Sequence, residues 1–107
     1  EETKRIYGQT IESRFEDTRV HVYYQPVGVV AALSPWNFPL ILAARKISTA
    51  LAAGCSVIIK PDTITPGVVM QLVDICRECG VPAGAVNLLS GDPPSIASST
   101  CCCLDIN

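Results

Sequence analysis

An asparagine at position 37 stands between two aromatic residues and two prolines, in the string Pro35-Trp36-Asn37-Phe38-Pro39. Its side-chain amide can donate two hydrogen bonds, and the prolines restrict the backbone on either side of it. A rigidly held amide of this kind can point a donor at an oxyanion. The alternative is a turn asparagine that satisfies nearby backbone groups, and the residue types alone favour this alternative.

Lys60 ends a short apolar run, SVIIK, and is followed directly by Pro61. A lysine at the end of a strand reaches the ligand-binding edge of a sheet, where its ammonium group can donate to hydroxyls or phosphates. A solvated strand end accounts for the same residue equally well. Neither G-x-G-x-x-G nor G-x-x-x-x-G-K-[ST] occurs in the sequence, so it contains no standard dinucleotide fingerprint and no P-loop.

The sequence contains six cysteines: Cys55, Cys76, Cys79, Cys101, Cys102 and Cys103. Cys76 and Cys79 form a C-x-x-C pair at the expected C-terminal end of a helix, whereas a redox pair belongs at a helix start, where the thiol pKa is lowered. A zinc site that includes the terminal triplet is a minor alternative, because no histidine is near. We expect free, idle thiols in a reducing compartment, Cys55 packed in the core and no metal site.

The chain of 107 residues is long enough for one small domain, yet 49% of its residues are hydrophobic and only 17% are charged. A domain of this size cannot bury so much apolar surface alone, so we expect a partner surface or further chain to cover part of it. The net charge is −2 and the basic residues are scattered, which disfavours nucleic acid as a partner. No apolar run is long enough to span a membrane, and the charged N-terminus does not resemble a signal peptide.

The first part of the sequence changes character at residue 20. Residues 1–19 form a polar, helix-compatible lead-in, and residues 20–26 contain a ribbon strand, Val20–Tyr24, in which apolar and polar side chains alternate. His21 on this strand is expected to be structural rather than catalytic. The following run, Val27–Leu33, is apolar without alternation, which predicts a strand buried on both faces.

Beyond residue 33 helical and strand patterns alternate, with short links between them. The predicted elements are a helix from Pro39 that ends at Gly54, a strand at 56–60, a helix capped by Thr65 that ends at Gly80, and a strand at 85–91. The order β-α-β-α-β is typical of a parallel α/β sheet. In such sheets ligands bind beyond the carboxyl ends of the strands, which here are Ser34–Asn37, Lys60–Thr63 and Ser90–Pro94.

Five motifs together resemble the aldehyde dehydrogenase superfamily, over about residues 1–99. They are P-V-G-V at 26–29, PWNFP at 35–39, A-L-A-A-G-C at 50–55, K-P-x-x-x-T-P at 60–66 and GVPAGAVNLLSGDP at 80–93. The resemblance implies NAD(P)-dependent oxidation of an aldehyde to a carboxylic acid, through addition of a cysteine thiolate and hydride transfer to the cofactor. It also implies a partial Rossmann-like, dinucleotide-binding domain at residues 27–100.

The resemblance assigns roles to residues of this sequence. Asn37 matches the asparagine that hydrogen-bonds the thiohemiacetal oxygen, and Lys60 matches the lysine that contacts the adenosine ribose. The ribbon Val20–Tyr24 matches part of the strand pair through which family members form homo-oligomers. The segment that lines the cofactor channel matches Leu33, Ser34, Pro35 and Trp36.

Two departures from the family pattern concern the cofactor. Many NAD-specific members have a glutamate three residues after the lysine, where this sequence has Thr63. A threonine hydroxyl can donate to a 2′-phosphate that a carboxylate would repel, so we expect NADP to be accepted or preferred over NAD, although Asp62 can restore part of the repulsion. Pro93 replaces a small glycine near the adenine, which puts that contact in doubt.

The end of the sequence, residues 101–107, is a cysteine-rich tail that departs from the family. The family supplies its catalytic cysteine and glutamate later in the chain, so we expect residues 1–107 alone to be inactive. Two hypotheses follow: a part of a complete aldehyde dehydrogenase, or an inactive product that binds dinucleotide weakly or associates with full-length subunits. The sequence does not name the aldehyde, although the match suggests short-chain dicarboxylic semialdehydes, and either the cytoplasm or the mitochondrial matrix suits free thiols.

Overall fold

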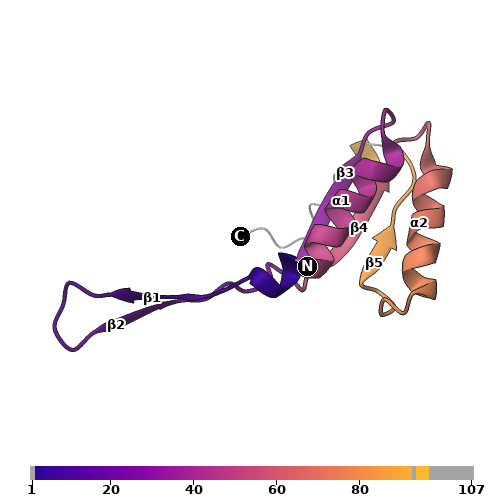
Figure 1. Ribbon diagram of the computed structural model, residues 1–107. Helices are drawn as coiled ribbons and strands as arrows, with labels where there is room; N and C mark the ends of the chain where they lie inside the picture. Colours follow the sequence, from indigo (N-terminus) through magenta and orange to yellow (C-terminus); the bar gives the residue numbers. More distant parts are fainter. Residues whose placement is uncertain (1, 93, 97–107) are drawn as a thin grey trace.

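The computed structural model describes residues 2–92 and 94–96, which form a long hairpin arm and an α/β body (Figure 1). The radius of gyration is 17.5 Å. A compact domain of this length would have a radius of about 13 Å. The difference arises because the arm stands away from the body instead of packing on it.

The arm begins with a short 3-10 helix, η1 (Glu2–Arg5), and continues into two antiparallel strands, β1 (Gln9–Glu12) and β2 (Arg19–Val22). Within the polar lead-in expected over residues 1–19, only η1 is helical, and β1 is a strand. Strand β1 is only four residues long, and its residues are all exposed. Its strand conformation depends on pairing with β2, which local residue preferences do not report.

The predicted ribbon strand is present as β2, which is shorter than the expected Val20–Tyr24. The His21 and Tyr23 rings lie 6.1 Å apart between centroids, so these side chains share one side of the strand as the alternation predicted. A hydrogen bond of 3.1 Å joins Thr10 Oγ1 to His21 Nδ1 across the two strands. This bond gives His21 a structural role within the arm.

The body contains a three-stranded parallel sheet in the order β3-β4-β5, formed by Val29–Ser34, Ser56–Pro61 and Val86–Leu88. Helix α1 (Pro39–Ala52) connects β3 to β4, and α2 (Pro66–Glu78) connects β4 to β5. The predicted β-α-β-α-β order and the α/β, Rossmann-like class are confirmed. The first and third strands begin later than predicted; Gly28, at φ 98°, interrupts the chain just before β3.

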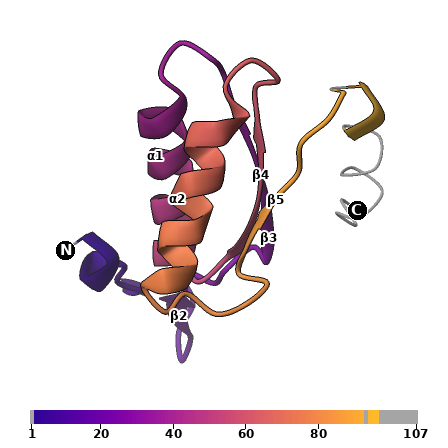
Figure 2. The same ribbon diagram turned by 90° about the vertical axis from the view of Figure 1, so that its right-hand side faces the viewer.

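Both helices pack on the same face of the sheet (Figure 2). The buried core lies between them and the sheet, and consists of Ala32, Ala43, Ile47, Ala50, Cys55, Val57, Ile59 and Val69. On the other face Val29 and Leu33 remain 46% and 63% exposed. The prediction that this strand is buried on both faces is wrong, because within the described residues only one face has helices over it.

Glycines end both helices as predicted. Gly54 and Gly80 adopt φ values of 77° and 88°, a left-handed conformation that residues with a Cβ avoid. Thr65 occupies the N-cap position of α2, but its side chain makes no capping hydrogen bond. Among the described residues, no helix has the length and apolar character needed to cross a membrane.

Candidate active site at the carboxyl edge of the sheet

The sheet register brings the two motif segments to one edge. Leu33 pairs with Lys60, and Ser34 pairs with Pro61, at the ends of adjacent parallel strands. The chain then leaves β3 through the turn that contains Asn37, and leaves β4 through the turn that contains Thr63. Both turns therefore start from the carboxyl edge, where open α/β sheets bind ligands.

Asn37 is exposed in the turn between β3 and α1, and its side chain forms no hydrogen bond with any other described residue. A turn asparagine that satisfies its local backbone would have such a bond. The amide is thus not used by the fold and remains available to a ligand. This observation weakens the structural interpretation that the residue types alone favoured.

Ser34 holds the base of this turn. Its side chain is buried, at 4% exposure, and its hydroxyl donates to the backbone oxygen of Pro39 over 3.3 Å. Pro39 is the first residue of α1, so this bond ties the end of the strand to the start of the helix. Ser34 faces the helices, and its hydroxyl supports the turn from inside the fold.

Apolar side chains surround the turn on its exposed side. Leu33 is 63% exposed, and Trp36 and Phe38 are each 60% exposed. Large apolar side chains left in water at one edge of a sheet indicate a surface that another group covers. The expected channel residues Leu33, Pro35 and Trp36 all lie on this surface.

Lys60 lies on the sheet face opposite the helices. It is half-buried, and its Nζ donates to the backbone oxygen of Pro61 over 3.0 Å. A lysine ammonium has three donors. The other two have no partner among residues 2–92 and 94–96 and can donate to a ligand at the carboxyl edge.

The turn after β4 is stabilised by Asp62. Its Oδ1 accepts a hydrogen bond of 3.0 Å from the backbone N–H of Ile64, and its backbone oxygen accepts one of 3.3 Å from Thr65. Thr63 at the tip of this turn is exposed. The hydroxyl of Thr63 is thus accessible, whereas the carboxylate of Asp62 is partly used by its own backbone.

Thr65 contains an orphaned polar atom. Its Oγ1 is buried and has no hydrogen-bond partner among the described residues. A buried hydroxyl without a partner is costly, and native proteins seldom leave one. The orphaned hydroxyl lies at the start of α2, just after the turn that contains Thr63.

The thiols lie away from this edge. Cys55 is buried in the core just before β4, as predicted, while Cys76 and Cys79 lie at the C-terminal end of α2. In a β-α-β unit these positions belong to the amino end of the strands. Residues 2–92 and 94–96 contain no cluster of three or more potential metal ligands.

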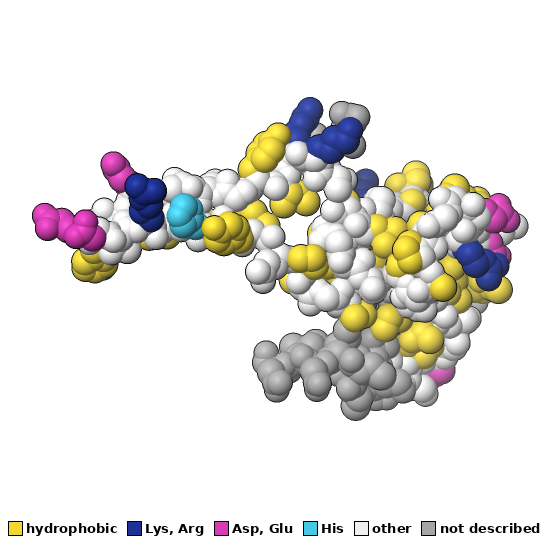
Figure 3. Space-filling model, turned by 90° about the horizontal axis from the view of Figure 1, so that it is seen from below, with side chains coloured by type: hydrophobic (Ala, Val, Ile, Leu, Met, Phe, Trp, Pro, Cys, Tyr) yellow, Lys and Arg dark blue, Asp and Glu magenta, His cyan; other side chains and the backbone are white. Residues whose placement is uncertain are grey.

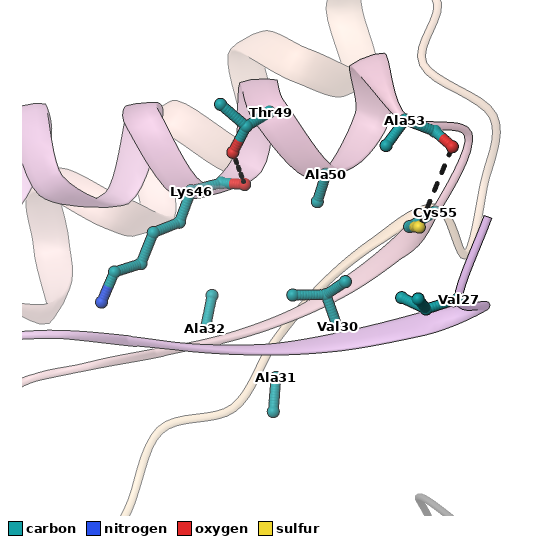
Figure 4. A pocket seen from close by; sticks show the side chains of 9 residues that line it. All are labelled: Val27, Val30, Ala31, Ala32, Lys46, Thr49, Ala50, Ala53 and Cys55. Atoms are coloured by element: carbon teal, nitrogen blue, oxygen red, sulfur yellow. Dashed lines mark hydrogen bonds between the residues drawn. The ribbon is translucent and has the colours of Figure 1, made fainter. Parts of the chain in front are cut away.

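Lys46 makes a contact that the sequence analysis did not predict. Its side chain leaves α1 and runs beside Ala32 toward β3 (Figure 4), and its Nζ donates to the backbone oxygen of Leu33. Its aliphatic part lines an apolar groove of about 330 Å³ between α1 and β3. No local signal identifies this contact, because the two residues are brought together by the fold.

Some expectations lie outside the described residues, namely those for Pro93 and for the tail at 101–107.

The remaining site residues occupy one edge of one sheet. Residues 1–106 of the chain match the Aldehyde dehydrogenase family. The chain belongs to the aldehyde dehydrogenase family.

Curated family members show how much of such an enzyme is present. The mitochondrial succinate-semialdehyde dehydrogenase of Oryza sativa is 46% identical over 99 residues, which are 92% of this chain and 19% of that protein. The Escherichia coli succinate-semialdehyde dehydrogenase [NADP(+)] GabD is 44% identical over 98 residues, 92% of this chain and 20% of that protein. The chain thus spans about a fifth of the length of these relatives.

Solved structures of the family have the same fold over this stretch. An aldehyde dehydrogenase of Brucella melitensis biovar abortus has a TM-score of 0.88 at 41% identity, with 91% of this chain and 20% of that chain covered. The betaine aldehyde dehydrogenase of Staphylococcus aureus in complex with NAD+ has a TM-score of 0.77 at 41% identity, with 81% and 17% covered. The resemblance stated from the motifs is thereby confirmed.

Proposed function

We propose that these residues form the first part of the cofactor-binding domain of an NAD(P)-dependent aldehyde dehydrogenase, which oxidises an aldehyde to a carboxylic acid. The observation that carries this proposal is that the turn with Asn37 and the strand end with Lys60 leave adjacent strands at the same carboxyl edge. An amide donor that the fold leaves free and a lysine with two free donors share one carboxyl edge. Family membership supplies the reaction class.

Asn37 acts as the oxyanion donor in this proposal. When a thiolate adds to the aldehyde, the carbonyl oxygen gains negative charge, and an amide N–H already aimed at that oxygen stabilises it. Two prolines and the bond from Ser34 to Pro39 hold the turn before substrate arrives. Pre-organisation is what makes such a donor effective, because no reorganisation is needed during the reaction.

The nucleotide cofactor fits the same edge. Lys60 offers two free ammonium donors to ribose hydroxyls, Thr63 offers an exposed hydroxyl, and Leu33 and Trp36 offer apolar surface. The Thr65 hydroxyl, at the start of α2 just after Thr63, is buried and has no hydrogen-bond partner among the described residues. The cofactor supplies the hydride acceptor, and these residues bind and orient its adenosine end.

The proposed cofactor preference is NADP, with NAD also accepted. Thr63 brings no negative charge toward the ribose, and Asp62 directs one carboxylate oxygen to the Ile64 N–H. A 2′-phosphate would then meet a hydroxyl donor at Thr63, and one oxygen of the neighbouring carboxylate is already engaged by the Ile64 N–H. Among the relatives, the Escherichia coli enzyme carries NADP(+) in its name, and the Staphylococcus aureus enzyme was crystallised with NAD+.

The nucleophilic thiolate and the general base come from other parts of the protein in this proposal. Cys55, Cys76 and Cys79 lie toward the amino end of the strands, whereas Asn37 lies beyond the carboxyl end. A thiol must be within bonding distance of the carbonyl carbon that Asn37 serves. Since the resemblance puts the catalytic cysteine and glutamate later in the chain, we expect residues 1–107 alone to have no dehydrogenase activity.

A semialdehyde with an acidic far end is the proposed substrate class. Support comes from relatives named for succinate semialdehyde, glutarate semialdehyde and 3-sulfolactaldehyde. Each of these names denotes an aldehyde that also has an acidic group. A complete enzyme of this kind should discriminate against an uncharged aldehyde of equal length.

A hybrid enzyme tests the proposal. The matching 98 residues of the Escherichia coli succinate-semialdehyde dehydrogenase are replaced by those of this chain. The rate of cofactor reduction is then compared between the hybrid and its Asn37→Ala variant. Loss of one oxyanion donor should lower kcat about 100-fold.

Two controls sharpen this test. Asn37→Asp keeps the size but removes the donors, so it should lose as much activity as Asn37→Ala. Cofactor affinity should stay unchanged in both variants, because the amide serves the reacting oxygen. An Asn37→Ala hybrid that retains full kcat would show that the proposed role is wrong.

The hairpin arm supports the alternative, or additional, role of association with other subunits. Figure 3 shows hydrophobic side chains along the arm between its charged tip and the body. Tyr23 and Tyr24 are 74% and 65% exposed, and Val20 is 40% exposed. Apolar side chains on an isolated two-stranded ribbon favour burial against another protein surface.

Size measurements test this role. In the hybrid enzyme, Val20→Asp with Tyr23→Asp should shift the particle from oligomer to monomer in sedimentation velocity. Glu16→Lys at the exposed turn is the control for a charge change that leaves the apolar side chains intact. An unchanged oligomer in the double variant would exclude the arm as the contact.

A further inference from the structure

We propose that Lys46 is a positioning residue that holds the Asn37 turn against α1, by donating a hydrogen bond to the backbone oxygen of Leu33. The inference rests on the proposed role of Asn37, which it deepens. Lys46 itself does not touch the reacting atoms in this proposal. Its contribution is to fix the strand end from which the turn departs.

The Leu33 oxygen lies on the free edge of β3. Backbone groups along a strand point alternately to either side, and Ser56 N–H donates to the Gly28 oxygen across the β3–β4 ladder. Even-numbered residues of β3 therefore face β4, and the Leu33 oxygen faces away from it. Within the described residues Lys46 is its partner.

Two side chains thus clamp the turn at its two ends. Lys46 reaches from α1 to the residue before the turn, and Ser34 donates to Pro39 at the residue after it. Five residues lie between Leu33 and Pro39, and three of them, Ser34, Pro35 and Trp36, precede Asn37. A turn held at both ends and stiffened by proline has few conformations, which is the condition for aiming an amide.

The path of the Lys46 side chain differs from that of a typical lysine on an exposed helix face. Exposed helix lysines normally leave their ammonium in water, and this one instead crosses the apolar groove between α1 and β3 (Figure 4). Its stem packs along the groove that Val30, Ala32 and Ala50 line. A long side chain loses rotamer entropy in such a position, and the bond to a carbonyl offsets this cost.

Trp36 provides the test, because it is the only tryptophan and lies next to Asn37 in the turn. In dilute solutions of the 107-residue chain, the anisotropy decay of Trp36 separates slow tumbling of an ordered turn from fast local motion. Lys46→Met keeps most of the stem but removes the donor. It should lower the ratio of ordered to mobile turn about tenfold, as expected for loss of one hydrogen bond from a charged donor.

Matched variants separate positioning from general stability. Lys46→Arg retains a charged donor and should restore most of the slow component. Arg45→Met removes the neighbouring exposed charge on the same helix and should leave the decay unchanged. An unaltered Trp36 decay in Lys46→Met, with helix content intact by circular dichroism, would overturn the proposal.

The hybrid enzyme gives the second readout and decides the matter if the Lys46→Met chain does not fold. There Lys46→Met should lower kcat about tenfold with cofactor affinity unchanged, and Lys46→Arg should recover it. Equal kcat in Lys46→Met and the parent would overturn the proposal. If Asn37→Ala has no effect while Trp36 still responds to Lys46, the positioning stands and the proposed role of Asn37 fails.

Discussion

Leu33 of β3 and Lys60 of β4 are direct partners in the parallel sheet, on the face that α1 and α2 do not cover. This pairing places an apolar side chain and an ammonium group side by side at the carboxyl edge. One suits the flat, apolar faces of a cofactor and the other suits its ribose hydroxyls. The pair is the starting point for predictions about cofactor binding.

Removal of the Lys60 ammonium should weaken cofactor binding. In the hybrid enzyme, Lys60→Met should raise the Kd for NADP about tenfold, because a charged donor to the ribose is lost while the stem is kept. Binding is measured by titration of cofactor fluorescence. Lys4→Met, in the exposed η1 helix, should leave Kd unchanged. Equal affinity in Lys60→Met and the parent would remove Lys60 from the cofactor site.

A carboxylate at position 63 should change cofactor choice. Thr63→Glu places a negative charge where we expect the 2′-phosphate of NADP, and should weaken NADP binding about tenfold or more while leaving NAD binding equal or stronger. The control is Thr63→Gln, because glutamine has about the size of glutamate but carries no charge. If Gln and Glu have the same effect, size rather than charge decides the preference.

Loss of the Ser34 hydroxyl should destabilise the chain. Ser34→Ala removes a buried hydrogen bond to Pro39, which should cost about 1 kcal/mol and lower Tm by about 5 °C. Ser48→Ala is the matched control, since that hydroxyl bonds the Arg45 oxygen on the exposed side of α1. Thermal unfolding followed by circular dichroism measures both. A Ser34→Ala chain as stable as Ser48→Ala would contradict the role given to this bond.

Two glycines should respond in opposite directions to alanine. Gly54 has φ 77°, and an added Cβ would lie 3.0 Å from Pro26 Cγ, so Gly54→Ala should destabilise the chain by about 1–2 kcal/mol. Gly67 lies in α2, with open space around an added Cβ, so Gly67→Ala should stabilise by about 0.5–1 kcal/mol. Urea unfolding compares the two variants. Equal shifts would refute the conformational argument for Gly54.

Local patterns were sufficient for much of the body. The 3.6-residue spacing of apolar side chains predicted the first helix, and Thr65 with Pro66 marked the start of the second. Gly54 and Gly80 marked the helix ends, since only glycine adopts their left-handed backbone easily. The parallel direction of the strands followed from the alternation of elements, so Asn37 and Lys60 could be placed at one edge. The motifs around these residues were also enough to indicate the family.

Contacts between distant residues decided the rest. Strand β1 exists because β2 pairs with it, and the open face of the sheet exists because both helices pack on the other face. Likewise, the Ser34 hydroxyl and the Lys46 ammonium acquire their partners only when α1 lies against β3. Spacing along the chain reports which residues can share a helix face or a strand end. It does not report which surface meets another, because that depends on the packing of the whole molecule.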